Sequence, residues 1–174
     1  MTTTTSEKDD IGKIIEKYVS ALLENREIKE NKNPLGYRVI SENCPHGIYI
    51  YDRKTGLWKL ITNNELIRDG YYVIYFNNSQ CIACKLFDFS WYIFIETIGK
   101  NYENIIFIIV RCEWFTTSCN SKLAKEYFKK FNITSSPSLI LIKAKNRKII
   151  VKKHIRGVKS PDELVEEIEK FMQT

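Results

Sequence analysis

Two cysteines separated by two residues, Cys81 and Cys84, are the residues whose types and spacing most directly suggest chemistry in this 174-residue chain. They follow a β-forming run, 71–76, and a polar loop, 77–80, and they precede an apolar segment, 85–100, with the pattern of a helix. A thiol at a helix N-terminus is close to unpaired backbone N–H groups and to the positive end of the helix dipole, which favour the thiolate. The three-residue offset lets the two sulfurs reach each other. The motif therefore predicts a pair that cycles between dithiol and disulfide.

The spacing of apolar residues predicts the elements that position this motif. Helical spacing predicts helices over 10–30, 85–99, 123–131 and 160–172, with a helical turn at 63–68, after a disordered tail at 2–6. β-forming runs predict strands over 37–40, 47–51, 57–61, 71–76, 104–110, 138–142 and 148–156. The apolar run 104–110 is typical of a strand that is buried on both faces. The order βα, βαβα, ββα therefore predicts an α/β fold in which helices cover both faces of a mixed sheet.

Composition and charge limit the classes of protein to consider. No window approaches the roughly 18 apolar residues of a membrane span. The first ten residues lack the basic and apolar regions of a secretory signal, so we expect a cytoplasmic protein without a membrane partner. The net charge of +6 lies after residue 70, and 143–159 holds eight Lys or Arg and no acid. Because no aromatic residues interleave with these charges, we interpret the basic segment as protection of an edge strand rather than as a nucleic-acid surface.

The element order and the position of the C-x-x-C motif resemble the thioredoxin family over roughly 57–172. A second marker is Ser135-Ser136-Pro137, immediately before the strand 138–142. The resemblance implies that Pro137 is cis and lies against the cysteines, and that the backbone of Ser136 binds the substrate chain as a short added strand. It also implies that Gly157, after the last strand, borders the same groove. By resemblance, Cys81 is the surface nucleophile and Cys84 the buried resolving thiol.

Several positions depart from the thioredoxin pattern. The residue before the first cysteine is Gln80 instead of the usual tryptophan, and the dipeptide between the cysteines, 82–83, is Ile-Ala instead of Gly-Pro. Because this dipeptide offers no charge or hydrogen bond to a thiolate, we expect a reductant or a mild oxidoreductase. Tyr75 replaces a buried aspartate six residues before Cys81. We therefore expect Cys84 to lie without a carboxylate base and to hold its proton tightly. The chain is interpreted as a divergent member of the family.

The remaining cysteines leave alternatives open. Cys112 and Cys119 flank an irregular segment, and their spacing suits either an auxiliary disulfide or two free thiols. A third alternative joins them with the C-x-x-C pair as four zinc ligands, although the C-x2-C…C-x6-C spacing is loose for such a site. Cys44 fits a buried structural thiol, and we assign no metal ligand.

These observations together predict a thioredoxin-like domain, 57–174, preceded by an extension, 1–56, that consists of a tail, a helix and a hairpin packed on the domain. The predicted function is thiol–disulfide oxidoreductase, with catalytic Cys81 and Cys84 and no cofactor. Its expected partners are substrate proteins with disulfides and a reductase or another thiol electron donor. Two alternatives are a redox-inert binding module of the same fold and a zinc-stabilised structural domain.

Overall fold

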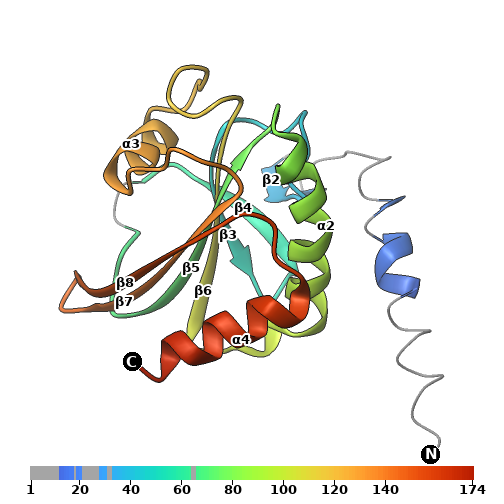
Figure 1. Cartoon of the computed structure of the whole chain (residues 1–174). Coiled ribbons are helices and arrows are strands. Elements are labelled where there is room, and N and C mark those ends of the chain that lie inside the picture. The colour runs from blue at the N-terminus through green and yellow to red at the C-terminus, as the bar shows by residue number, and fades with distance from the viewer. Residues whose placement is uncertain (1–11, 18, 21–27, 31–32, 64–65) are drawn as a thin grey trace, which may run out of the picture.

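The computed structural model describes residues 12–17, 19–20, 28–30, 33–63 and 66–174 (Figure 1). Its named elements are β1 (Ile28–Glu30), β2 (Asn33–Gly36), β3 (Gly47–Asp52), β4 (Leu57–Ile61), β5 (Gly70–Asn78), α2 (Ile82–Thr97), η1 (Gly99–Asn101), β6 (Ile105–Cys112), α3 (Lys122–Lys130), β7 (Ser138–Lys145), β8 (Lys148–Arg156) and α4 (Pro161–Met172). Within the described part of the chain, no helix has the length and apolar character that crossing a membrane requires.

The N-terminal predictions fall only partly on described residues. Residues 12–17 and 19–20 are helical, as predicted, whereas 28–30 form strand β1 and pair with β2. The rest of the predicted helix and the predicted tail at 2–6 lie outside the described residues. The predicted strand at 37–40 is reduced to a single bridge between Tyr37 and Trp58.

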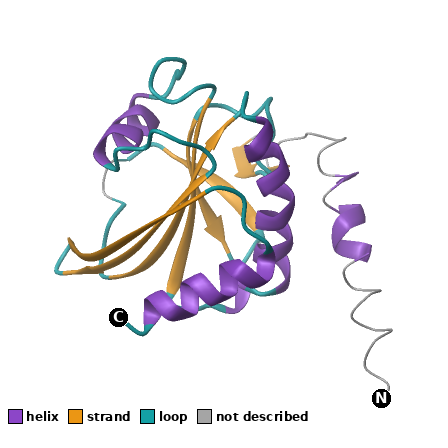
Figure 2. Cartoon of the chain, in the orientation of Figure 1, coloured by secondary structure: helices purple, strands orange, loops and turns teal. Residues whose placement is uncertain are grey.

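Six strands form one mixed sheet in the order β4-β3-β6-β5-β7-β8. β5 and β6 run parallel, and each of the other neighbouring pairs runs antiparallel. Helices α2 and α4 cover one face of this sheet and α3 covers the other (Figures 1 and 2). The predicted α/β class, with a mixed sheet between helices, is confirmed.

The alternation of side chains along β5 creates two cores and decides what faces α2. Val73 and Tyr75 pack in the core beneath α2 and α4, whereas Ile74 and Phe76 pack in the core beneath α3. Asn77, the residue before the last one of the strand, keeps this alternation and reaches the α2 face, where it contacts Asp88. Polar groups therefore enter the α2 core at the end of the strand that leads to the C-x-x-C motif.

The β3–β4 hairpin is part of the main sheet. β3 lies antiparallel beside β6, with Gly47 opposite Arg111 and Ile50 opposite Ile108. The predicted boundary between 1–56 and 57–174 falls in the turn between the two strands. The structure therefore does not divide the chain there, because both strands of the hairpin hydrogen-bond within one sheet. A local pattern identifies a hairpin, but it does not identify the sheet that the hairpin joins.

The predicted helical turn at 63–68 is absent from the described residues 62–63 and 66–69. A single turn gains too few hydrogen bonds to offset the entropy of nucleating a helix. A tertiary contact orders the segment instead, because the Tyr72 hydroxyl accepts from the Arg68 N–H at 2.7 Å and donates to the Arg68 carbonyl at 3.0 Å.

Candidate active site

Cys81 is the N-cap residue of helix α2. Its backbone is extended, and its sulfur accepts a hydrogen bond from the Cys84 N–H at 3.1 Å. The first turn of a helix leaves backbone N–H groups without intrahelical partners, and the Cys81 sulfur satisfies one of them. The same sulfur lies 3.5 Å from the Ser136 carbonyl oxygen. Only 7% of the residue is exposed, so its thiol is almost covered where α2 meets the loop that precedes β7, a position that we call the recess.

Cys84 lies one helical turn further into the protein, and it is fully buried. Both cysteines are free thiols in this structure. Burial raises the pKa of the Cys84 thiol to about 12, because a thiolate there would be removed from water. At neutral pH Cys84 is therefore a protonated thiol, and it needs a proton acceptor before it can act as a nucleophile.

The loop before β7 forms the other wall of the recess. The Ser136–Pro137 peptide bond is cis, and the Pro137 carbonyl accepts from the Gly157 N–H at 3.0 Å. The Ser136 carbonyl contacts the Cys81 sulfur. The structure thus brings together Cys81, Ser136, Pro137 and Gly157, which the sequence assigns to one groove.

The segment 112–119 forms a third wall beside the motif. Cys112 and Cys119 are joined by a disulfide with a Cα–Cα distance of 4.8 Å. The Gln80 N–H donates to the Glu113 carbonyl at 3.3 Å, and the Gln80 side chain donates to the Glu113 carboxylate at 2.7 Å. Trp114, which is 44% exposed, extends from this loop into solvent.

The zinc alternative is contradicted by this pairing. A four-cysteine zinc site needs four thiolates, and two of the four sulfurs are bonded to each other. Among the residues that the structure describes, no group of three or more His, Cys, Asp or Glu side chains is placed to hold a metal ion.

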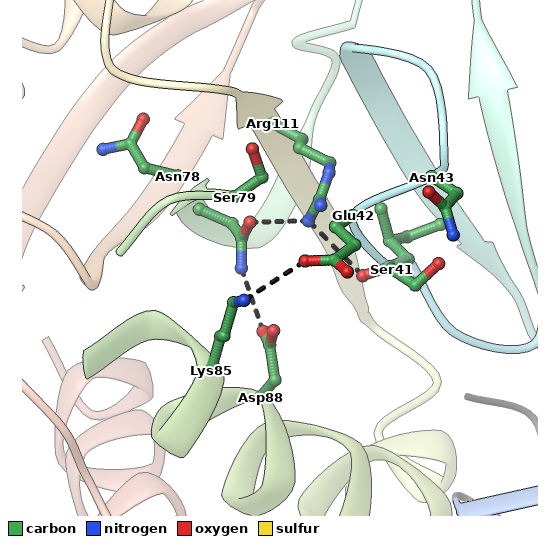
Figure 3. A pocket seen from close by; sticks show the side chains of 10 residues that line it. Ser41, Glu42, Asn43, Asn78, Ser79, Lys85, Asp88 and Arg111 are labelled. Carbon is green, nitrogen blue, oxygen red and sulfur yellow. Dashed lines mark hydrogen bonds and ion pairs between the residues drawn. The ribbon is translucent and has the colours of Figure 1, made fainter. Parts of the chain in front are cut away.

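A polar network lies on the α2 face of the sheet, and Figure 3 shows two of its members, Asp88 and Arg111. The Tyr75 hydroxyl lies 3.3 Å from the Cys84 carbonyl oxygen and donates to the Asp88 carboxylate at 2.8 Å. The Asn77 side chain donates to the Tyr75 oxygen at 2.8 Å and to Asp88 at 3.0 Å, and it accepts from Arg111 at 2.8 Å. The network therefore joins β5, α2 and β6, and it contacts Cys84 through the backbone carbonyl oxygen.

The comparisons with known proteins bear on the fold. No protein-family model matches the sequence, and no curated protein matches it either. Among solved structures, the thioredoxin of Aeropyrum pernix superposes with a TM-score of 0.53 at 14% identity, over 74% of this chain and 97% of that chain. The chain has a thioredoxin fold.

Two further thioredoxins are similar to this chain. That of Plasmodium falciparum is 24% identical over 60% of this chain and 84% of that chain, with a TM-score of 0.43. That of Trichomonas vaginalis is 18% identical over 59% of this chain and 79% of that chain, with a TM-score of 0.44. The identities are low, as expected of a divergent chain. The activity must therefore be argued from the site itself.

The thioredoxin fold of this chain contains a carboxylate that the sequence analysis missed. Tyr75 in place of an aspartate predicts a Cys84 without a carboxylate base, but Asp88 lies on the hydroxyl of that same Tyr75. The hydrogen bonds of Asp88 go to Tyr75 and Asn77 and not to the Cys84 thiol, and the raised pKa of that thiol agrees with the prediction of a tightly held proton. Asp88 itself was missed because the prediction considers only the strand and not the facing helix. Asp88 follows Cys84 by four residues, so the two share a helix face. That spacing, within an otherwise apolar segment, was the available signal.

Arg111 was missed for a similar reason. The predicted strand ends at residue 110, whereas Arg111 belongs to β6 and is only 2% exposed. In the parallel register Arg111 lies opposite Asn77, and alternation puts both side chains on the α2 face. Arg111 directly follows the apolar run 105–110 and alternates in step with Phe107 and Ile109, which pack beneath α2. That alternation was a signal that the sequence could have provided.

Proposed function

We propose that this chain is a thiol–disulfide oxidoreductase that reduces or exchanges protein disulfides through Cys81 and Cys84. The observation that carries the proposal is the position of the Cys81 sulfur. It lies at the N-terminus of α2, between the Cys84 N–H and the Ser136 carbonyl. The partner thiol is buried one turn below it.

The reaction consists of two exchanges. The Cys81 thiolate attacks one sulfur of a substrate disulfide, forms a mixed disulfide, and releases the other substrate sulfur as a thiolate. The Cys84 thiolate then attacks the Cys81 sulfur, which forms the Cys81–Cys84 disulfide and releases the second substrate thiolate. Two electrons pass from the dithiol to the substrate. A reductase or another thiol donor must then restore the dithiol.

The surface around Cys81 suits a protein substrate. Ile82, directly after the nucleophile, is 78% exposed, and Leu86 is 65% exposed. Trp114, which is 44% exposed, lies on the loop whose Glu113 contacts Gln80, the residue before the nucleophile. Exposed apolar groups of this size favour contact with another protein chain over contact with a small polar disulfide. We therefore assign protein disulfides as the substrate class.

Insulin reduction with dithiothreitol as electron donor tests the proposal. Cys81→Ser should abolish turnover, whereas Cys84→Ser should accumulate a mixed disulfide with substrate, because the resolving thiol is missing. Cys44→Ser is the matched control, since Cys44 is a buried free thiol outside the site. It should change neither result.

Two outcomes would contradict the proposal. Turnover in Cys81→Ser at the rate of the unaltered chain would show that the C-x-x-C pair is not the reacting group. An unaltered chain that binds reduced and oxidised substrates without exchanging electrons would instead favour the redox-inert binding module.

A further inference from the structure

A buried arginine that forms no ion pair with any described residue lies near the end of β6. Arg111 is only 2% exposed. One terminal nitrogen of its guanidinium donates to the Asn77 side-chain oxygen at 2.8 Å and to the Ile40 carbonyl at 3.4 Å. Its Nε atom is buried and has no hydrogen-bond partner within the described part of the chain. A buried cation is costly unless an opposite charge and hydrogen bonds compensate it.

The Asp88 carboxylate of α2 compensates this charge only in part. The Asn77 amide lies between the two groups: its nitrogen donates to Asp88 at 3.0 Å, and its oxygen accepts from Arg111. Burial raises the pKa of the Asp88 carboxyl to about 7, which the hydrogen bond from Tyr75 and the charge of Arg111 partly offset. Near neutral pH a large share of the Asp88 side chains is therefore protonated and carries no charge.

Arg111 and Asp88 both line a polar pocket of about 320 Å³ (Figure 3). Arg111 reaches the pocket from β6, whereas Lys85 and Asp88 reach it from α2. This volume lies at the lower end of the roughly 300–1,000 Å³ that is typical of small-molecule sites. The uncharged polar side chains of the lining are Ser41, Asn43, Asn77, Asn78 and Ser79. The pocket therefore offers a small ligand both room and hydrogen-bonding groups.

The charged groups of the lining decide the sign of that ligand. Besides Arg111 and Asp88 they are Lys85 and Glu42, which pair at 3.2 Å and whose side chains are 59% and 64% exposed. An exposed pair of this kind is held weakly, so Lys85 is free to turn toward a ligand. The described lining carries one net positive charge when Asp88 is protonated and none when it is ionised. It therefore favours an anion, and more strongly below pH 7 than above it.

We propose that this pocket binds a small oxyanion, such as sulfate, inorganic phosphate or the phosphate group of a small ester. The anion accepts hydrogen bonds from the guanidinium of Arg111 in the interior and from the ammonium of Lys85 nearer the surface. Arginine suits this ligand because its planar fork of donors matches two oxygens of such an ion. A protonated Asp88 adds one O–H donor. The described lining contains no cysteine, so the site does not depend on the function proposed above.

Asp88 makes the binding depend on pH. An anion in the pocket opposes ionisation of Asp88, so it should bind with uptake of a proton and lose affinity as pH rises through about 7. Burial and the charge of Asp88 raise the pKa of Tyr75 well above 10, and burial and Arg111 lower the pKa of His46, so both stay neutral near pH 7. The other charged groups around Asp88 and Arg111 are Glu42, Lys85 and Glu113.

Isothermal titration calorimetry with sodium sulfate tests the proposal, at an ionic strength held constant with sodium chloride. Sulfate is a dianion at both pH 6 and pH 8, so a change in affinity reports on the protein. The unaltered chain should bind saturably and lose affinity about fivefold from pH 6 to pH 8. Heats in buffers of different ionisation enthalpy should show the proton uptake near pH 7. Asp88→Asn should bind as tightly at pH 8 as at pH 6.

Charge variants locate the binding in this pocket. Lys85→Gln should weaken sulfate binding and Glu42→Gln should strengthen it, each on the order of threefold, because they remove an attracting and a repelling charge. Lys159→Gln is the matched control, since it removes the charge of another ion-paired lysine outside the lining; it should leave the affinity unchanged. Arg111→Gln should abolish binding. The two variants at positions 42 and 85 are exposed and keep the test decisive even where Arg111→Gln folds poorly.

Three outcomes would overturn the proposal. The first is an unaltered chain without saturable sulfate binding. The second is an equal loss of affinity in Lys85→Gln and Lys159→Gln, which would indicate general attraction to a basic protein. The third is an equal affinity of the unaltered chain at pH 6 and pH 8, which would place the anion away from Asp88.

Inorganic phosphate and glycerol 3-phosphate distinguish the two sources of the anion. Both are compared on Asp88→Asn at pH 8, where both ligands are mainly dianions. Tighter binding of the ester supports a phosphorylated small molecule as the ligand, whereas equal or tighter binding of inorganic phosphate supports the free ion. Failure of both to bind would overturn the proposal.

Discussion

Asp88 is held in a place that opposes its own ionisation. Its folded-state pKa of about 7 lies well above the value of a free aspartate. A carboxyl with a raised pKa stabilises the fold below its unfolded pKa, and this contribution is lost as pH rises through the folded pKa. The site therefore keeps a carboxylate near the buried thiol at a cost in stability that increases toward neutral pH.

This cost gives a prediction for stability against pH. Between pH 4 and pH 8 the unaltered chain should lose on the order of 4 kcal/mol of unfolding free energy relative to Asp88→Asn. The reason is that only the unaltered chain must ionise a carboxyl group at position 88 inside the fold as pH rises. Urea unfolding of both chains at several pH values measures this difference, and contributions from His46 and His154 cancel in it. Parallel curves for the two chains would show that Asp88 ionises as freely in the fold as in the unfolded chain.

Single residues were the hardest part of the site to predict. The two cysteines and Pro137 follow from a motif, because their spacing along the chain determines where they lie. Asp88 and Arg111 contribute through contacts with Tyr75 and Asn77, which are distant in the sequence or on another element. Spacing along one element shows which face a residue occupies, but the partner on that face depends on how helix and sheet pack.

At the scale of elements, Asn78 connects three loops that build the recess. It is fully buried at the end of β5. Its side-chain oxygen accepts from the Phe115 N–H at 2.7 Å, and its nitrogen donates to the Ser136 hydroxyl at 2.9 Å. The carbonyl of Asn78 also accepts from the Cys81 N–H at 3.0 Å. The side chain of Asn78 thus positions the 112–119 loop and the loop before β7, and its backbone carbonyl positions the start of α2.

We therefore predict a specific effect of Asn78→Ala. The change leaves the Phe115 N–H without its partner and should destabilise the fold by about 1–3 kcal/mol. Native-state hydrogen exchange should show a faster exchange of the Phe115 amide. Ser136→Ala removes only the other contact and should leave that amide protected. Equal Phe115 protection in the Asn78→Ala and unaltered chains would contradict the role assigned to Asn78.

The disulfide loop yields a second prediction at this scale. Cys112 and Cys119 close a loop with a sequence separation of 7. Closing a loop of this length is worth about 2–3 kcal/mol through the entropy of the unfolded chain. Replacing both cysteines with serine should therefore lower the unfolding free energy by that amount.

Guanidinium unfolding measures this loss, with Cys81→Ser in all chains so that the C-x-x-C pair cannot add a bond. Adding reductant should destabilise the chain that keeps Cys112 and Cys119 and leave the doubly substituted chain unchanged. An equal response of both chains to reductant would show that the loop is not closed by this bond in solution.

Elements with strong local signals were predicted well. The capping box at Ser160 and Glu163 marks the start of α4, and both of its hydrogen bonds are present. The apolar run of β6 and the hairpin of β7 and β8 are where the sequence places them. The prediction of a helical turn at 63–68 was wrong. The contact that orders Arg68 comes from Tyr72, which lies outside the segment.

At the scale of the whole molecule, the sequence predicts the layers but not the full sheet. The βαβ order leads to a parallel pair with helices on opposite faces, and β5 with β6 follows it. The strand on the other side of β6 could have been either strand of the hairpin, since both show similar alternation. The structure selects β3, whose Tyr49 is fully buried in the core beneath α2 and whose Ile48 is fully buried in the core beneath α3.

The position of β3 leads to the last prediction, which concerns truncation. A chain that begins at Ile28 keeps every strand of the sheet, whereas one that begins at Leu57 lacks β3 and exposes the edge of β6. The second chain also loses the buried side chains of Ile48, Tyr49 and Tyr51. At about 1.5–3 kcal/mol for each large apolar side chain, this loss is comparable to the 5–15 kcal/mol that stabilises a typical domain.

We therefore expect the chain that begins at Ile28 to unfold cooperatively, with a denaturant midpoint close to that of the full chain. The chain that begins at Leu57 should show no cooperative transition and should self-associate, because removal of β3 leaves the backbone of the apolar strand β6 unpaired. Urea titration followed by tryptophan fluorescence, together with light scattering, distinguishes the two. Cooperative unfolding of the 57–174 chain would show that β6 tolerates a free edge and that the hairpin is an appended unit after all.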